Sequence, residues 1–128
     1  MLGASERVTL SLARADASDY DALVIAGGAG APTHLWDNEP LRALIRSMHA
    51  ARKPIAAICL SPPVLARAGV LSGLRATTYP DPRAILELKR GGATYVDEPV
   101  VQQGTIVTGN GPDAASAFGA ALATLVSA

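Results

Sequence analysis

The sequence has little cysteine, few aromatic residues and no excess of charge of either sign. Its single cysteine among 128 residues excludes an internal disulfide framework and a zinc site built from several cysteines. Basic residues number 11 and acidic residues also number 11, so the chain lacks the basic character typical of nucleic-acid-binding proteins, and we expect no nucleic-acid partner. Aromatic residues make up only 4%, so the core has to be aliphatic.

Long hydrophobic runs are also missing. The longest apolar stretches, Ala22–Ala26 and Ile55–Leu60, are far shorter than the about 20 residues that cross a bilayer, so we expect no membrane association. The first ten residues, MLGASERVTL, lack the basic segment and apolar segment of a secretory signal peptide. We therefore expect a cytoplasmic protein.

The remaining pattern predicts one α/β domain over residues 1–128. Hydrophobic residues make up 49% and charged residues 17%, which is typical of a folded chain. Short apolar runs alternate with amphipathic segments, as in flavodoxin-like proteins whose mainly parallel sheet lies between helices. The expected strands are Val8–Leu12, Ala22–Ala26, Ile55–Ile58, Ala76–Thr78, and a hairpin of Val100–Gln102 with Thr105–Thr108. The expected helices run from residue 39 to about Arg52, over Pro62–Ala68, from Pro82 to Gly91, and from Asp113 to the C-terminus.

Helix ends and helix faces can be read from the same sequence. Asn38 or Asp37 is expected to cap the first long helix, and Asp81 is expected to cap the helix that begins at Pro82. The apolar stripe of the first long helix is expected to consist of Leu41, Leu44, Ile45 and Met48.

The segment around Cys59 carries the main chemical signal. The strand Ile55–Ile58 ends just before Cys59, and a helix begins within three residues, at Pro62. A side chain at such a turn projects above the carboxyl end of the sheet, where α/β proteins bind ligands. The helix N-terminus should lower the pKa of a nearby thiol and favour the nucleophilic thiolate. The alternative is a buried cysteine that packs as a small hydrophobe.

Several segments together resemble the ThiJ/PfpI superfamily. Ala57-Ile58-Cys59 followed by Ser61-Pro62 is similar to the nucleophile elbow of that group. Further stretches match in the same order: Tyr20–Gly28, Ala68–Leu71, Arg75–Pro80, Tyr95–Asp97 and Gly109–Pro112. The resemblance implies a flavodoxin-like, class I glutamine amidotransferase-like fold, a reactive Cys59 and no cofactor. Because no cluster of histidine, cysteine and carboxylates occurs, we also expect no metal.

The loop Gly27-Gly28-Ala29-Gly30 follows a strand but is not a dinucleotide-binding loop. Thr33 stands where the third glycine of that fingerprint would be. In the resembled superfamily this loop lies beside the cysteine and contributes to an oxyanion hole, so the resemblance assigns that role to the backbone N–H groups of Gly28 and Leu60. The pocket candidates are Gly27, Thr33, His34, Ser61 and Tyr79.

Some of these candidates also have a purely structural interpretation. Gly27 can serve a tight turn that needs a glycine backbone. His34 could replace a missing base beside Cys59, or it could be a solvated loop residue. Ser61 is a weak nucleophile candidate that could instead cap the helix starting at Pro62. Tyr79 could contact a substrate or pack at a strand end.

The chain departs from the superfamily pattern in its catalytic partners. Protease-like members have a histidine after the cysteine, where this chain has Leu60, and a glutamate at the position of Thr33. A Cys–His–Glu triad is therefore missing, and we expect no peptidase activity. The members also have an earlier strand–helix–strand that supplies a glutamate to the cysteine. A chain that starts at Met1 would lack it, either because its start is assigned too late or because it is shortened, and we expect an exposed sheet edge that favours self-association.

Two functions remain open. In the first, the protein is a stress-response enzyme in which Cys59 attacks a small carbonyl substrate such as methylglyoxal, in glyoxalase or deglycase chemistry implied by the resemblance. In the second, the protein is a non-enzymatic oxidative-stress sensor or chaperone-like protein, and Cys59 is oxidised reversibly to sulfenic acid. In either case we expect a homodimer or a higher homo-oligomer.

Overall fold

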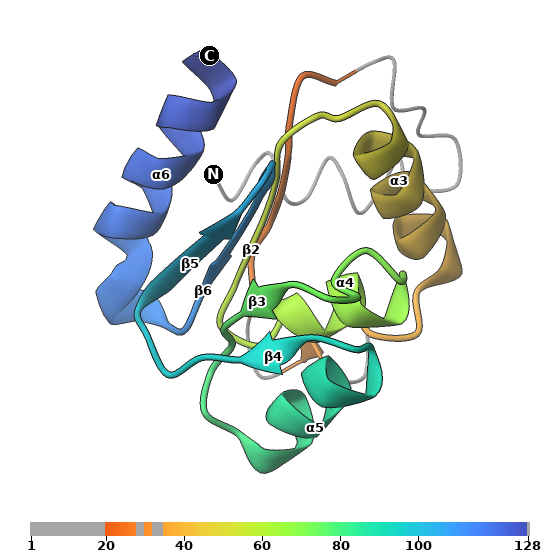
Figure 1. Cartoon of the computed structure of the whole chain (residues 1–128), viewed down its shortest axis with the longest axis vertical. Helices are drawn as coiled ribbons and strands as arrows, with labels where there is room; N and C mark the ends of the chain where they lie inside the picture. The colour runs from red at the N-terminus through yellow and green to blue at the C-terminus, as the bar shows by residue number, and fades with distance from the viewer. Residues whose placement is uncertain (1–19, 28–29, 32–34, 128) are drawn as a thin grey trace.

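A mainly parallel four-stranded sheet forms the centre of the molecule. The computed structural model describes residues 20–27, 30–31 and 35–127. The strands lie in the order β1 (Leu23–Ile25), β2 (Ile55–Ile58), β6 (Ile106–Gly109) and β5 (Val100–Gln103). β1, β2 and β6 are parallel, and β5 runs antiparallel to β6 (Figure 1). The predicted α/β class and the predicted hairpin are both confirmed.

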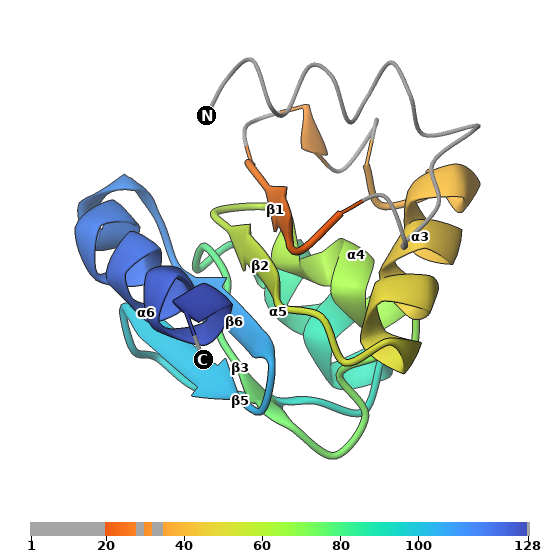
Figure 2. The same ribbon diagram turned by 90° about the horizontal axis from the view of Figure 1, so that it is seen from above.

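Helices cover both faces of this sheet. The helices of the described residues are α3 (Glu39–Ala50), α4 (Pro62–Arg67), α5 (Pro82–Arg90) and α6 (Ala115–Ser127), the last preceded by a 3₁₀ turn, η3 (Pro112–Ala114). α6 packs against β2, β5 and β6 on one face, while α3 and α4 pack against β2 on the other (Figures 1 and 2). None of the helices in the described part of the chain is long and apolar enough to cross a membrane.

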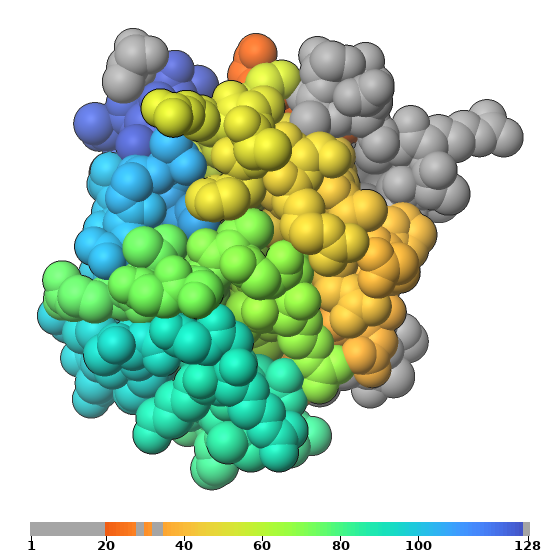
Figure 3. Space-filling model, turned by 45° about the vertical axis from the view of Figure 1, so that its right-hand side comes forward, coloured from red at the N-terminus to blue at the C-terminus, as the bar shows by residue number. Residues whose placement is uncertain are grey.

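A second, smaller sheet lies beside the first. It pairs β3 (Arg75–Ala76) in parallel with β4 (Thr94–Tyr95), and the helix between them, α5, packs on α4. Figure 3 shows the segments of α3, α4 and α5 side by side on one face of the molecule. The sequence did not indicate β4, because two residues are too few to show an alternating pattern.

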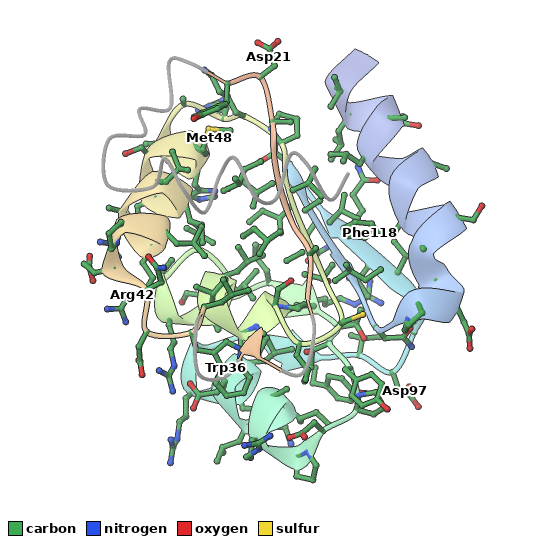
Figure 4. All side chains as sticks on the ribbon, turned by 180° about the vertical axis from the view of Figure 1, so that it is seen from behind. Asp21, Trp36, Arg42, Met48, Asp97 and Phe118 are labelled. Carbon is green, nitrogen blue, oxygen red and sulfur yellow. The ribbon has the colours of Figure 1, made fainter. Side chains whose placement is uncertain are left out.

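β2 is apolar throughout because its alternate side chains enter two different cores. Ile55 and Ala57 belong to the larger cluster, which also contains the buried residues of α3 and the buried Val64, Leu65 and Ala66 of α4. Ala56 lies on the opposite face with Val107 and with Phe118 of α6, which Figure 4 shows directed toward the sheet. Burial on both faces is typical of the central strands of parallel sheets and accounts for the unbroken apolar run.

The predicted caps and the predicted apolar stripe are confirmed. The Asn38 side chain accepts a hydrogen bond from the Leu41 N–H at 2.9 Å, and the Asp81 side chain accepts one from the Arg83 N–H at 2.8 Å. The buried residues of α3 are the four expected ones, Leu41, Leu44, Ile45 and Met48. α3 ends at Ala50 rather than near Arg52, because Arg52 has φ +59°, which is incompatible with a right-handed helix.

Other predicted boundaries need correction. The strand expected over Ala76–Thr78 occupies Arg75–Ala76, and the helix expected to reach Ala68 ends at Arg67. The final helix starts as the 3₁₀ turn η3 before α6. The predicted strand Val8–Leu12 lies outside the described residues.

Candidate functional site

Three segments meet at Cys59. β1, β2 and β6 run in the same direction, so their carboxyl ends lie at one edge of the sheet, and the chain there continues into Ala26-Gly27, Cys59 and Asn110. The Cys59 N–H donates to the Gly109 carbonyl at 3.1 Å. Gly27 lies so close that a Cβ on it would be 2.8 Å from the Cys59 Cβ and 2.7 Å from the Leu60 nitrogen. Cys59 is therefore enclosed by backbone on both sides.

The backbone of Cys59 adopts a left-handed conformation. Its φ is +62°, and the chain passes within three residues from β2 into α4. Non-glycine residues seldom adopt this conformation, and surrounding contacts have to stabilise it. Cys59 as a whole residue is partly exposed rather than fully buried. The local structure is the strand-to-helix elbow that the sequence predicted, and it is incompatible with a fully buried Cys59.

Hydrogen bonds from the segment after β3 hold the carbonyl of Cys59. The Tyr79 N–H donates to it at 2.8 Å, and the Thr78 hydroxyl donates to it at 2.9 Å. Thr78 is fully buried, whereas the neighbouring Tyr79 side chain is 47% exposed. The sequence did not indicate this role of Thr78, because a buried threonine beside a short strand has no distinctive pattern.

Leu60, the residue after the cysteine, has its two backbone polar groups in different environments. Its carbonyl accepts a hydrogen bond from Trp36 Nε1 at 2.7 Å. Its N–H donates to no acceptor among residues 20–27, 30–31 and 35–127. This N–H is the oxyanion-hole donor expected from the resemblance. That role remains a prediction, and the second expected donor, Gly28, lies outside the described residues.

A charged group lies over the ring of Trp36, whose Nε1 is hydrogen-bonded to the elbow. The Arg67 guanidinium lies over the indole, 5.6 Å from its centroid. Arg67 also forms a 2.8 Å ion pair with Glu87 of α5 and a further ion pair with Asp37. Nothing in the local sequence pattern indicated the hydrogen bond of Trp36 to a residue 24 positions away.

The expected lowering of the thiol pKa is wrong in direction. Burial raises the pKa of the Cys59 thiol, because a partly desolvated thiolate is less stable than a solvated one. The expected donors at the start of α4 are missing: Pro62 and Pro63 have no N–H, and the Val64 N–H already donates to the Ser61 carbonyl at 3.0 Å. The helix therefore supplies little to offset the desolvation.

The raised pKa predicts slow alkylation at neutral pH. Only the thiolate reacts, so iodoacetamide should modify folded Cys59 at pH 7 more slowly than the same cysteine in the urea-unfolded chain. The alkylation rate plotted against pH should inflect at a higher pH in the folded protein. Since the chain has one cysteine, intact mass follows this single event. An inflection at or below that of the unfolded chain would contradict the dominance of burial.

The raised pKa of the Cys59 thiol also determines how the stability of the protein changes with pH. The folded state holds the thiol proton more tightly than the unfolded state does. The stabilisation due to this proton is therefore fully present below the unfolded pKa of the thiol, and it is lost as the pH rises through the higher folded pKa.

Ser61 does not have the roles expected from the sequence. Its side chain forms no cap hydrogen bond with α4 and has 0% exposure, so it cannot line a pocket. The hydroxyl accepts from the Ile58 N–H at 3.0 Å and lies 2.8 Å from the carbonyl oxygens of both Ile25 and Ile58, with one proton to donate between them. Ser61 therefore joins the ends of β1 and β2 below the elbow.

The remaining pocket candidates fall into two groups. Tyr79 is exposed, and a Cβ on Gly111 would be 3.7 Å from its ring, so Tyr79 stands beside the segment after β6. Its contact with a substrate remains a prediction. The two candidates from the glycine loop, Thr33 and His34, lie outside the described residues.

The described residues give the thiol no acid or base partner. Within residues 20–27, 30–31 and 35–127, no aspartate, glutamate or histidine is hydrogen-bonded to Cys59, and no group of three potential metal ligands occurs. His49 is exposed near the end of α3.

A hollow of about 450 Å³ opens at the other end of the sheet. It is lined by residues that precede strands and by the end of α6: Asp21, Arg52, Pro54, Thr105, Leu125 and Val126. Figure 4 shows Asp21 at the opposite end of the molecule from Trp36, which contacts the elbow. The hollow is therefore separate from the site around Cys59.

Together these features define an α/β protein with a cysteine at the strand-to-helix elbow of a mainly parallel sheet. Residues 1–125 match the DJ-1/PfpI family, and the chain belongs to that family. The resemblance to the ThiJ/PfpI superfamily is thereby confirmed, and with it the flavodoxin-like fold.

Individual relatives support this assignment. The chain is 46% identical to an uncharacterised protein of Methanocaldococcus jannaschii over 93% of its own length and 58% of that protein's. It is 36% identical to a deglycase of Pyrococcus horikoshii, over 86% of its own length and 64% of the relative's. The crystal structure of a ThiJ/PfpI domain protein from Brachyspira murdochii superposes with a TM-score of 0.83 at 29% identity, covering 91% of this chain and 65% of that one. The chain thus spans less than two thirds of these proteins.

Proposed function

We propose that this protein is a stress-response member of the DJ-1/PfpI family whose Cys59 acts on small reactive carbonyl compounds, with methylglyoxal as the representative substrate. The observation that carries the proposal is the elbow itself: a partly exposed cysteine at φ +62°, next to the Leu60 N–H, which is unpaired among the described residues. A thiolate beside a fixed amide donor can add to a carbonyl and stabilise the resulting oxyanion. The similarity to a deglycase points to the same class of substrate.

In the first step the Cys59 thiolate adds to the aldehyde carbon. A carbon–sulfur bond forms and the carbonyl electron pair moves to oxygen, where the Leu60 N–H stabilises the negative charge. This oxygen then takes a proton from water, which gives a hemithioacetal. Addition needs the thiolate, so the raised pKa of Cys59 makes this step faster at higher pH.

The second stage moves hydrogen within the substrate. One proton leaves the former aldehyde carbon and one is added to the neighbouring ketone carbon, through an enediol, so the first carbon is oxidised and the second is reduced. The product is a lactate thioester of Cys59. Water then cleaves its carbon–sulfur bond and releases lactate and the free thiol. One methylglyoxal and one water thus become one lactic acid, and His34 remains the sequence candidate for the base.

The direct test is lactate formation from methylglyoxal. The wild-type protein should form lactate, and the Cys59→Ser and Cys59→Ala variants should fall to the rate without protein, because the nucleophile is lost. His49→Ala, on the exposed face of α3, is the matched control and should retain the wild-type rate. Equal lactate formation by the wild type and the Cys59 variants would overturn the proposal.

A second experiment distinguishes catalysis by Cys59 from oxidation of Cys59 in a sensor. Intact mass after mild peroxide would show a 16 Da adduct on Cys59 if the thiol forms sulfenic acid. An adduct in a protein that forms no lactate would favour the sensor alternative. The proposal also includes assembly as a cytoplasmic homo-oligomer. Peptidase activity is not part of it, because Leu60 replaces the triad histidine.

A further inference from the structure

The peptide bond between Cys59 and Leu60 has one hydrogen-bond acceptor and one hydrogen-bond donor, and the two have different roles. Its carbonyl belongs to Cys59 and its N–H belongs to Leu60, the proposed oxyanion donor. The peptide is trans, so this carbonyl and this N–H point in opposite directions from one rigid plane. Whatever fixes the direction of the Cys59 carbonyl therefore fixes the direction of the Leu60 N–H as well.

Two donors fix that carbonyl, and one of them is a side chain. The Tyr79 N–H binds it at 2.8 Å and the Thr78 hydroxyl binds it at 2.9 Å. A single backbone donor would allow the plane to turn about the hydrogen-bond axis, whereas two donors at different places limit that rotation. The Thr78 side chain has 0% exposure, so packing holds its hydroxyl in place and water does not compete for it.

The next peptide along the chain is held from the other side. Trp36 Nε1 donates to the Leu60 carbonyl at 2.7 Å, and the Ser61 N–H of that same peptide donates to the Ile58 carbonyl at 3.2 Å. The two peptides that flank Leu60 are thus both anchored, while the Leu60 N–H is left without a partner among the described residues. A donor that is fixed in direction and unpaired is preorganised for an anion.

From this arrangement we infer that Thr78 is a positioning residue: its hydroxyl, by holding the Cys59 carbonyl, keeps Cys59 in its left-handed conformation and aims the Leu60 N–H at the oxyanion of the substrate. The inference rests on the proposed function for the identity of the anion. The orientation of the Cys59–Leu60 peptide does not depend on which reaction the protein catalyses.

The chain offers a closely matched control next to Thr78. Thr77 is also a threonine with 0% exposure, and its hydroxyl is buried without a hydrogen-bond partner. Thr78→Val and Thr77→Val therefore make the same chemical change at adjacent buried positions, and only the first removes a bond to Cys59. Thr78→Ser keeps the hydroxyl and should rescue the effect.

The expected result is a change in kcat with little change in KM. Thr78→Val should lower kcat for lactate formation about 10- to 100-fold, somewhat less than the roughly 100- to 1000-fold loss that follows removal of an oxyanion donor itself. Thr77→Val should stay within about 2-fold of wild type, and Thr78→Ser within about 3-fold. Alkylation of Cys59 by iodoacetamide, which develops no oxyanion, should change less than about 2-fold in all three variants.

A crystal structure of Thr78→Val supplies a readout that needs no turnover. We expect the Cys59 carbonyl to rotate away from its position beside its two donors, the Thr78 hydroxyl and the Tyr79 N–H, with the rotation taken up in ψ of Cys59 and φ of Leu60. An unchanged peptide plane together with an unchanged kcat would overturn the inference, as would equal losses of kcat in Thr77→Val and Thr78→Val. If the wild type forms no lactate, the proposed function is wrong. The orientation of the Cys59–Leu60 peptide plane in the crystal structure of Thr78→Val still tests the role of Thr78.

Discussion

Gly27→Ala should destabilise the protein by about 3 kcal/mol or more, at the upper end of the cost of overpacking a core. A Cβ at this position would lie 2.4 Å from the Ile58 carbonyl oxygen and 2.7 Å from the Leu60 nitrogen. Both neighbours are backbone atoms of β2 and the elbow, so neither can swing aside as a flexible side chain would. Relief of the clash has to separate β1 from β2 or move the Cys59 turn.

Gly119→Ala is the matched control for this prediction. Nothing lies within 4 Å of a Cβ added at Gly119, which is exposed in α6. Removing a glycine from a helix interior should stabilise the protein by about 0.5–1 kcal/mol. The two variants thus have opposite expected signs in urea unfolding. Equal midpoints for Gly27→Ala and wild type would show that the β1 end is not held against the elbow as the structure has it.

Ser61→Ala should cost about 2–3 kcal/mol of unfolding free energy. The variant removes a fully buried hydroxyl that bonds the Ile58 N–H and lies 2.8 Å from two backbone carbonyl oxygens, leaving buried polar groups without that partner. Chemical denaturation followed by circular dichroism measures the loss. The control is Ser116→Ala, an exposed serine in α6 that should change stability by no more than about 0.5 kcal/mol.

A smaller loss of unfolding free energy in Ser61→Ala would contradict the role of the Ser61 hydroxyl described above. If Ser61→Ala and Ser116→Ala unfold at the same urea concentration, the hydroxyl does not join the ends of β1 and β2. Ser61→Ala is also expected to alter alkylation of Cys59, because the Ile58 N–H lies directly before the elbow. Ser116→Ala should leave that rate unchanged.

The sequence predicted the helices and strands that are determined by residues close together in the chain. The unbroken apolar run Ile55–Ile58 identified a strand buried on both faces, and Asn38 and Asp81 marked helix starts that the structure confirms. These features depend on residues within a few positions of one another. The elbow at Cys59 was predicted for the same reason, since strand, turn and helix follow directly in sequence.

Contacts between distant segments could not be predicted in this way. Thr78 reaches Cys59 from 19 positions away, and Trp36 reaches Leu60 from 24 positions away. The direction of the thiol pKa was also missed, because it depends on how much surrounding chain covers the sulfur and on two prolines that remove helix donors. Burial and long-range pairing are consequences of the tertiary fold rather than of local pattern.

The indole bonded to the elbow gives the molecule a built-in optical reporter. Trp36 is the only tryptophan in the chain, and its Nε1 donates to the carbonyl of Leu60, the residue after Cys59. Its emission spectrum depends on that hydrogen bond and on the guanidinium stacked over the ring. Occupation or oxidation of Cys59 that shifts the turn can thus be followed in real time by intrinsic fluorescence, without any added label.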